Sequence, residues 1–112
     1  MIELIKIFDS LIMDYQQNNL PREIPDDGFY LITCGLSQKS SITASSIGDD
    51  GFVYCIQRSF KTRSGKILEP QEFKVCWLKK PENLYPYLET VTLLLILDVP
   101  PVQISDNILF LS

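Results

Sequence analysis

Hydrophobic residues near the start of the chain recur at three- and four-residue steps, and polar residues occupy the opposite arc. This spacing is typical of an amphipathic helix with one apolar face. Asn18, Asn19 and Pro21 then stop the pattern. The sequence therefore predicts a helix over residues 2–17. Its apolar positions are Leu4, Ile5, Phe8, Leu11, Ile12 and Tyr15.

Patterns typical of strands follow. Residues 20–28 contain two prolines and end in a turn sequence, so they are expected to form a loop. Residues 29–34 are rich in aromatic and β-branched side chains and predict a strand. Residues 35–50 contain no aromatic residue and many serines. We expect that segment to be mostly mobile loop, with a weak edge strand near Ile42.

The clearest pattern is a hairpin in the middle of the chain. Two apolar segments, residues 52–60 and 67–78, flank a polar stretch that contains Ser64-Gly65. A two-residue turn there places six large side chains on one face of the strand pair, and a slip by one residue divides them. Pro70 indicates an edge strand or a bulge, beyond which the pairing shifts. The predicted pairs are Phe52 with Trp77, Tyr54 with Val75, and Ile56 with Phe73.

Residues 84–97 fit two structures. Asn83 can cap a helix with Pro86 in its first turn, and leucine and valine then recur at helical spacing. The β-branched run 90–92, followed by five aliphatic residues, also fits a buried strand. We favour a mostly buried helix. Pro100 and Pro101 end it, and one or two short strands are expected between residues 102 and 111.

These elements predict an α+β fold. The N-terminal helix packs on an antiparallel sheet of about four to six strands, and the second helix lies near residues 84–97. The chain has 112 residues, of which 46% are hydrophobic. That length and composition fit one domain over residues 1–112, in which helix and sheet share a core.

Charge is unevenly distributed along the chain. The net charge is −4, yet most of the ten basic residues fall between residues 58 and 80. Four of them surround the predicted hairpin tip: Arg58, Lys61, Arg63 and Lys66. Such a tip can contact the phosphates of a nucleic acid. Alternatively, the charges only keep an exposed strand edge from pairing with other chains.

Acidic residues gather in two turns with the same sequence, Asp-Asp-Gly-Phe. Asp26 and Asp27 open the first, and Asp49 and Asp50 open the second. If the two turns lie at the same end of the sheet, the four carboxylates form a patch suited to a basic partner. Each motif is also ordinary turn chemistry. Neither loop has the ligand spacing of an EF-hand, so a divalent-cation site is disfavoured.

The sequence contains few of the residues and motifs that enzymes use in catalysis. Histidine is absent, which removes the commonest general base and the most frequent transition-metal ligand. The isolated glycines form no phosphate-binding loop, and the three cysteines form no C-x-x-C pair. In the predicted register Lys74 faces Cys55 and would lower the pKa of its thiol, with Cys76 a diagonal neighbour. A small buried hydrophobe is the more common role of such a cysteine. We expect no enzyme, cofactor or metal.

The same observations predict a location. The first twenty residues carry charges and lack the pattern of a signal peptide. The longest apolar run, residues 90–97, is too short to span a bilayer, so no membrane partner is expected. An odd number of widely spaced cysteines favours a reducing compartment, the cytoplasm.

These observations lead to a hypothesis of function. The chain is expected to be a non-enzymatic protein-binding module that occludes or presents a macromolecular partner. Immunity proteins, secretion chaperones and phage anti-defence proteins act in this way, and the analogy rests on size and charge alone. Self-association as a homodimer is one form of the hypothesis. The alternative is an accessory protein that binds nucleic acid. The expected contacts are Arg58, Lys61, Arg63 and Lys66 at the tip, with Asp26, Asp27, Asp49 and Asp50 at the turns.

Overall fold

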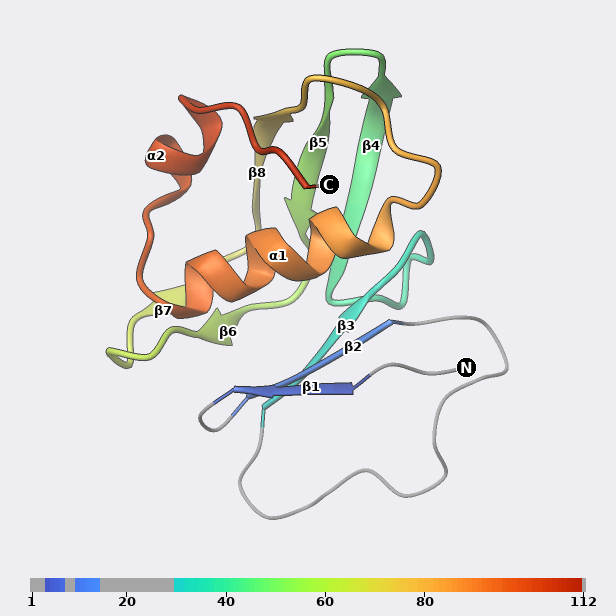
Figure 1. Cartoon of the computed structure of the whole chain (residues 1–112). Coiled ribbons are helices and arrows are strands. Elements are labelled where there is room, and N and C mark those ends of the chain that lie inside the picture. The colour runs from blue at the N-terminus through green and yellow to red at the C-terminus, as the bar shows by residue number, and fades with distance from the viewer. Residues whose placement is uncertain (1–3, 8–9, 15–29, 112) are drawn as a thin grey trace.

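A computed structural model describes residues 4–7, 10–14 and 30–111, and over these residues the fold is α+β (Figure 1). Six strands form the main sheet in the order β1-β2-β3-β4-β5-β8, and β6 and β7 form a separate small sheet. The strands are β1 (Leu4–Ile7), β2 (Ser10–Asp14), β3 (Tyr30–Cys34), β4 (Ile42–Gly48), β5 (Gly51–Ile56), β6 (Phe60–Lys61), β7 (Ile67–Leu68) and β8 (Gln71–Cys76). The helices are α1 (Tyr85–Ile96) and α2 (Pro101–Ser105).

The main sheet is mixed, which corrects the antiparallel sheet expected from the sequence. β3 runs parallel to both of its neighbours, β2 and β4, whereas the other pairs are antiparallel. The reason is the path of residues 35–41, which return the chain so that Ile42 starts β4 beside Cys34, the end of β3. The N–H of Gly35 donates to the carbonyl of Ile42 at 3.0 Å and closes this return.

The helix predicted over residues 2–17 is not supported. Its described parts are the strands β1 and β2, which pair with each other, while the remainder of that range lies outside the described residues. Short apolar runs fit helical and extended periods equally well, so periodicity alone could not decide. β-branched isoleucines favour the extended form. β2 also obtains backbone partners on both sides, from β1 and β3. The loop predicted over residues 20–28 lies outside the described residues.

Residues 42–48 are not the weak edge strand that their polar composition indicated. They form the seven-residue strand β4, which pairs with β5 along its length and, in the described sheet, meets β3 at one residue pair, Cys34 with Ile42. The preceding loop is fastened by the side chain of Gln57, whose amide donates to the carbonyls of Ser37 at 3.2 Å and Ser40 at 2.8 Å. Thr33 and Ser41 add reciprocal bonds between their side chains and backbones. The polar residues of this loop therefore serve to hold it in place by hydrogen bonds.

The predicted register of the central strand pair is wrong by two residues. Phe52 lies opposite Val75, Tyr54 opposite Phe73, and Ile56 opposite Gln71. The connection is not a two-residue hairpin, because β6 and β7 pair separately on either side of a turn closed from Thr62 to Lys66. Since the shift is even, the predicted face is kept. The rings of Phe52 and Trp77 still touch, with centroids 5.0 Å apart, because they are diagonal neighbours.

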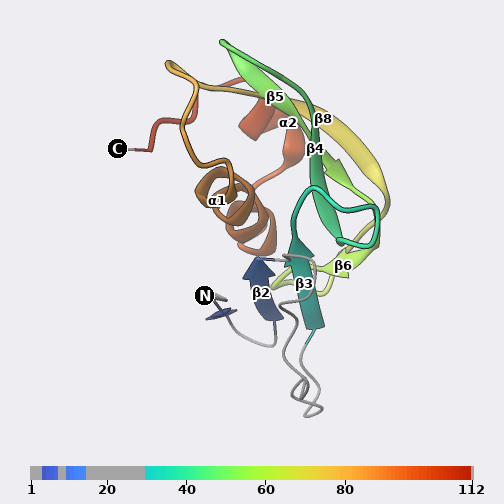
Figure 2. The ribbon, with the colours of Figure 1, turned by 90° about the vertical axis from the view of Figure 1, so that its right-hand side faces the viewer.

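Helix α1 confirms the helix expected near residues 84–97. It lies against one face of the sheet (Figures 1 and 2). Pro86 sits in the first turn, where its missing N–H costs no hydrogen bond. The helix buries six residues on the sheet, and the core that results includes side chains from both helices and both sheets. The buried residues are Tyr87, Leu88, Val91, Thr92, Leu95 and Ile96.

The strands expected between residues 102 and 111 are replaced by α2 and a short extended segment. Pro101 starts α2, as its fixed φ allows. The segment after it meets β8 at one parallel bridge between Cys76 and Ile108, where the Leu109 N–H donates to the Cys76 carbonyl at 2.8 Å. Neither helix in the described part of the chain has the length and apolar character needed to cross a membrane.

Candidate docking face

The basic tip predicted from the sequence exists as the β6–β7 turn. Lys61, Arg63 and Lys66 lie on it with exposed side chains, and Arg58 precedes it. The turn is fastened to the end of α1, because the Arg63 N–H donates to the Ile96 carbonyl at 2.7 Å. Three of the four cations predicted at the tip therefore lie on this turn, whereas Arg58 lies before β6, where its N–H bonds to the Ser41 carbonyl.

An acidic residue missed by the sequence reading sits at the base of this tip. Asp98 follows α1 and accepts a hydrogen bond of 2.7 Å from the Ser64 hydroxyl. Hydrogen bonds from Thr62 and Ser64, together with the charge of Arg63, hold the pKa of the Asp98 carboxyl below its usual value. The tip is thus a mixed-charge surface in which Asp98 offsets part of the positive charge.

The second acidic turn lies at the other end of β5 from the tip (Figure 1). Asp49 and Asp50 form the exposed turn between β4 and β5. The Trp77 indole N–H lies 3.1 Å from the backbone carbonyls of Gly48 and Asp49. The Trp77 backbone N–H donates to the backbone carbonyl of Asp50. This supports the turn-forming role of the motif. Asp26 and Asp27 lie outside the described residues, so whether the two turns share an end of the sheet stays a prediction.

The shifted register changes the expected chemistry of the cysteines. Glu72 lies opposite Cys55, and Lys74 lies opposite Val53 with its ammonium 3.4 Å from Asp50. Burial raises the pKa of the Cys55 thiol; a hydrogen bond with Ser45 opposes this, and the Glu72 charge adds to it. Lys74 therefore does not activate this thiol. Cys76 pairs with Gly51 instead of lying diagonally across from Cys55.

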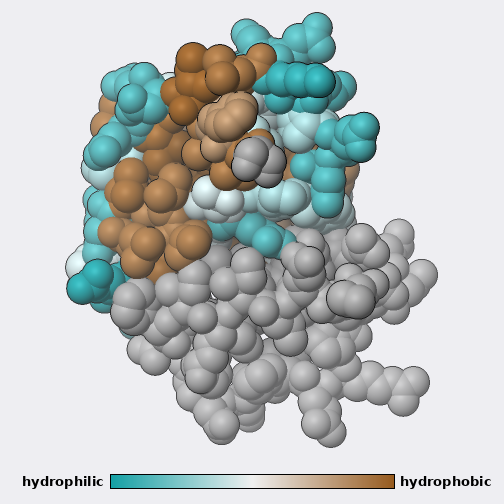
Figure 3. Space-filling view, viewed as in Figure 1, coloured by the Kyte–Doolittle hydropathy of each residue, from teal (hydrophilic) through white to brown (hydrophobic). Residues whose placement is uncertain are grey.

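Apolar side chains gather on the surface where α1, α2 and residues 106–111, which we call the C-terminal segment, meet. Brown residues spread over these elements in Figure 3. Leu94, Val99, Ile108 and Leu109 line a groove there, and Leu97 at the end of α1 and Val102 in α2 are exposed; we call these six residues the apolar face. Val102 and Ile108 are 65% and 59% exposed, so they remain largely in contact with water. Large contiguous apolar surfaces of this kind mark interaction sites.

A groove of about 230 Å³ runs through the apolar face. Leu94 and Val99 form one wall, Ile108 and Leu109 another, and the amides of Gln103 and Asn107 lie at its edge. Its volume exceeds that of a single leucine or phenylalanine side chain. Asp98 brings the basic tip to the same end of α1 that carries Leu94 and Leu97, so the tip borders this face.

Sequence reasoning missed the apolar face for a specific reason. One or two short strands were expected between residues 102 and 111, where the structure has α2 and an extended segment instead. The sequence of α1 nevertheless indicated an apolar surface. The helix carries one charged residue, Glu89, and its apolar residues extend beyond the face that packs on the sheet. A helix that is apolar nearly all round requires cover on more than one side.

The described residues contain no group of three or more Cys, Asp or Glu side chains placed to hold a metal ion. Comparison with known proteins gives no further guide to the class of site. No family model matches the sequence, no curated protein matches it, and no solved structure matches the fold.

Proposed function

We propose that this chain is a cytoplasmic, non-enzymatic module that binds another protein on the apolar face and thereby occludes or presents it. The observation that carries the proposal is the exposure of apolar side chains around a groove at the junction of α1, α2 and the C-terminal segment. Burying such side chains against a partner is favourable at roughly 25 cal/mol per Å². The cysteines Cys34, Cys55 and Cys76 are free thiols, which supports a reducing compartment.

The chemistry expected of the partner follows from what borders the groove. An apolar side chain of the partner would fill the groove, as anchor residues do at the centre of many interfaces. Carboxylates of the partner would face Lys61, Arg63 and Lys66 at the adjoining tip, where rim charges chiefly set the rate of association. The Asp49–Asp50 turn lies about 20 Å away along β5, so we assign the contact to the tip.

The test is capture followed by reconstitution. The full chain is used as bait in extracts of its native host, the retained protein is identified, and binding is then measured with two purified components. A Val102→Glu substitution places a charge on the face without touching the core, because Val102 is 65% exposed. We expect it to weaken binding at least about 30-fold, the effect of losing one anchor contact.

Leu36→Glu is the matched control, since Leu36 is 60% exposed and belongs to the loop between β3 and β4. It should leave the affinity unchanged. Equal affinity of the Val102→Glu and wild-type chains would refute the assigned face. If the only partner is a second copy of this chain, sedimentation should show a dimer that Val102→Glu dissociates.

A second candidate function rests on the tip itself. Three exposed cations at the turn, with Arg58 before it in the chain, could neutralise phosphates of a nucleic acid, although Asp98 at the base of the turn reduces the positive potential. The two proposals differ in which substitution abolishes binding: a charge on the apolar face in the first, and charge reversal at the tip in the second.

A further inference from the structure

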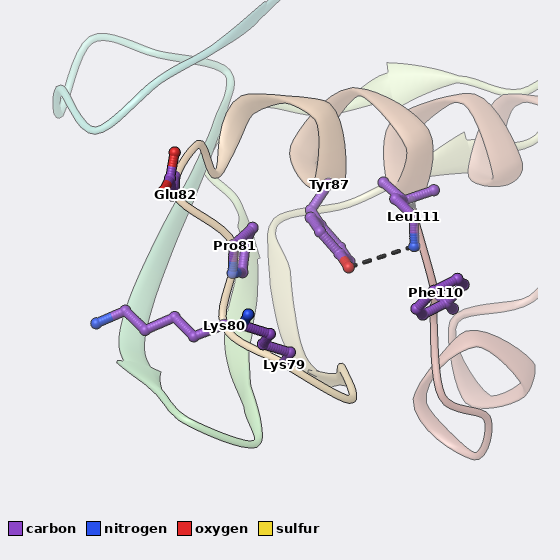
Figure 4. A pocket seen from close by; sticks show the side chains of 7 residues that line it. All are labelled: Lys79, Lys80, Pro81, Glu82, Tyr87, Phe110 and Leu111. Atoms are coloured by element: carbon purple, nitrogen blue, oxygen red, sulfur yellow. Dashed lines mark hydrogen bonds between the residues drawn. The ribbon is translucent and has the colours of Figure 1, made fainter.

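We propose that a pocket beside the first turns of α1 binds a small carboxylic acid that carries an apolar group. The pocket measures about 340 Å³, within the range of small-molecule sites. Lys79, Lys80 and Pro81 form one side, Phe110 and Leu111 the other, and Tyr87 lies between them (Figure 4). Neither the apolar face nor the partner proposed for it enters this argument.

The first observation concerns the phenol at the centre of the pocket. Tyr87 is 4% exposed, and its oxygen accepts a hydrogen bond of 3.3 Å from the Leu111 N–H. A phenol can also donate one hydrogen bond. Among the described residues no acceptor is paired with that proton. A buried O–H donor facing a pocket is satisfied when a ligand supplies an oxygen acceptor.

The second observation is the charge of the walls. Lys79 and Lys80 are exposed, and neither lies within 4.0 Å of a carboxylate in the described part of the chain, where Lys74–Asp50 is the ion pair formed. Glu82 also lines the pocket, and Figure 4 places it at the end away from Phe110. Figure 4 shows the Lys80 side chain extending away from Tyr87 and Phe110, which leaves the Lys79 ammonium as the cation that favours an anion beside the phenol.

The form of the anion follows from the donors that the pocket lacks. Phosphate sites commonly use free backbone N–H groups at the start of a helix. Here the Tyr85 N–H is bonded to the Asn83 side chain, Pro86 has no N–H, and the next two N–H groups donate to Leu84. A carboxylate needs fewer donors, and the Tyr87 phenol together with the Lys79 ammonium can supply them.

The apolar part of the ligand has a place on the opposite wall. The Phe110 ring is 64% exposed and stands next to Leu111. An aromatic or aliphatic group laid on this ring would leave water together with it, which adds a favourable hydrophobic contribution. The ligand class is therefore a carboxylate close to an apolar group, as in small aromatic acids and in polypeptides that end in an apolar residue.

The chain contains a reporter for this site. Trp77 is its single tryptophan, and its ring meets the Tyr87 ring edge-on with centroids 5.2 Å apart. Titration with N-acetyl-phenylalanine should change the tryptophan fluorescence in a saturable way. N-acetyl-phenylalaninamide has the same ring without the charge and should bind about tenfold more weakly or not at all, since a hydrogen bond to a charged group is lost.

Variants locate the effect. Lys79→Gln with Lys80→Gln, and Phe110→Ala alone, should each reduce the affinity for the acid about tenfold, whereas Lys66→Gln at the distant tip should leave it unchanged. Comparing the acid with a tetrapeptide that ends in phenylalanine separates the two sources, because tighter binding of the peptide indicates a polypeptide C-terminus. Equal binding of acid and amide, or no response at about 10 mM ligand, would overturn the proposal.

Discussion

The hydroxyl oxygens of Tyr54 and Thr92 lie 2.7 Å apart inside the core and join strand β5 to helix α1. Thr92 donates its own proton to the Leu88 carbonyl at 2.7 Å, so Tyr54 is the donor in the bond between them. Both residues are fully buried, and the Cys34 sulfur lies 3.8 Å from the same threonine oxygen. This polar link fixes the helix on the sheet at one position.

We expect Thr92→Val to destabilise the fold by about 1–3 kcal/mol, because it leaves the buried Tyr54 hydroxyl without an acceptor. Tyr54→Phe should cost about 1 kcal/mol, since Thr92 keeps its bond to Leu88. With both substitutions together no hydroxyl remains unpaired, so the double variant should be more stable than Thr92→Val alone. Urea unfolding followed by Trp77 fluorescence measures all three. If the losses of unfolding free energy of the two single variants simply add in the double variant, the hydrogen bond between Tyr54 and Thr92 is contradicted.

Stability should also fall at alkaline pH through Tyr54. Burial raises the pKa of its phenol well above the usual value; the Cys34 charge adds to this, and the bond to Thr92 opposes it. The unfolded chain releases this proton near pH 10 and the folded chain retains it, so the contribution is complete below about pH 10 and is lost as pH rises further. The loss approaches about 1.4 kcal/mol per pH unit.

Tyr54→Phe should lack this contribution. The stability difference between wild type and variant, measured by unfolding at each pH, should be constant up to about pH 9 and shrink above pH 10. A difference that stays constant through pH 11 would show that Tyr54 titrates normally in the folded protein.

Gly51 should be the least replaceable glycine of those with positive φ in the described residues. A Cβ added there would collide with the Val75 carbonyl oxygen across the strand pair, so Gly51→Ala should cost about 3 kcal/mol or more. Gly65 has φ +88° and nothing within 4 Å of an added Cβ. Gly65→Ala should therefore cost only about 1 kcal/mol of backbone strain. Thermal unfolding of both variants compares the two; equal losses would contradict the close approach.

The reactivity of Cys55 provides a chemical test of the strand register. Glu72 lies opposite Cys55 and its charge raises the thiol pKa. Glu72→Gln should therefore speed alkylation of Cys55 at pH 8 by roughly two- to threefold, the effect of one screened surface charge. Lys74→Gln should change the rate less, because Lys74 is held beside Asp50. Peptide mass spectrometry after timed iodoacetamide treatment gives the rates. A dominant effect of Lys74 would instead support the register predicted from sequence.

If the tip binds nucleic acid, affinity for a single-stranded oligonucleotide should fall steeply with salt, with a slope of about −0.7 per phosphate neutralised. Reversing two charges, Lys61→Glu with Arg63→Glu, should remove most of the binding. Asp50→Asn, at the far end of β5, is the control. Binding that is absent, or insensitive to salt, would eliminate this function.

The part of the fold that the sequence predicted rests on local patterns. Alternation along residues 52–56 and 73–77 assigned every large side chain to the correct face, because neighbouring residues of a strand point to opposite sides. Helical spacing of Leu88, Val91 and Leu95, with Pro86 in the first turn, correctly favoured α1 over a buried strand. Pro70 correctly marked an edge, since β8 ends the order of described strands.

Other features depended on residues far apart in the chain. The register of β5 and β8 is set by the β6–β7 turn, and that turn is held by Ile96 and Asp98, more than thirty positions away. No local pattern encodes such an anchor. β4 looks like loop in isolation and becomes a strand because β5 pairs with it along its length.

The sequence by itself determined the α+β class, the second helix, the shared face of the central strands and the presence of a basic turn. Periodicity and proline chemistry act within a few residues, so they can be read directly. Only the tertiary structure decided the mixed sheet, the pairing register, the separation of the Asp49–Asp50 turn from the tip, and the meeting of α1, α2 and the C-terminal segment. These features arise from contacts that close long loops, and surface exposure is a property of the packed molecule as a whole.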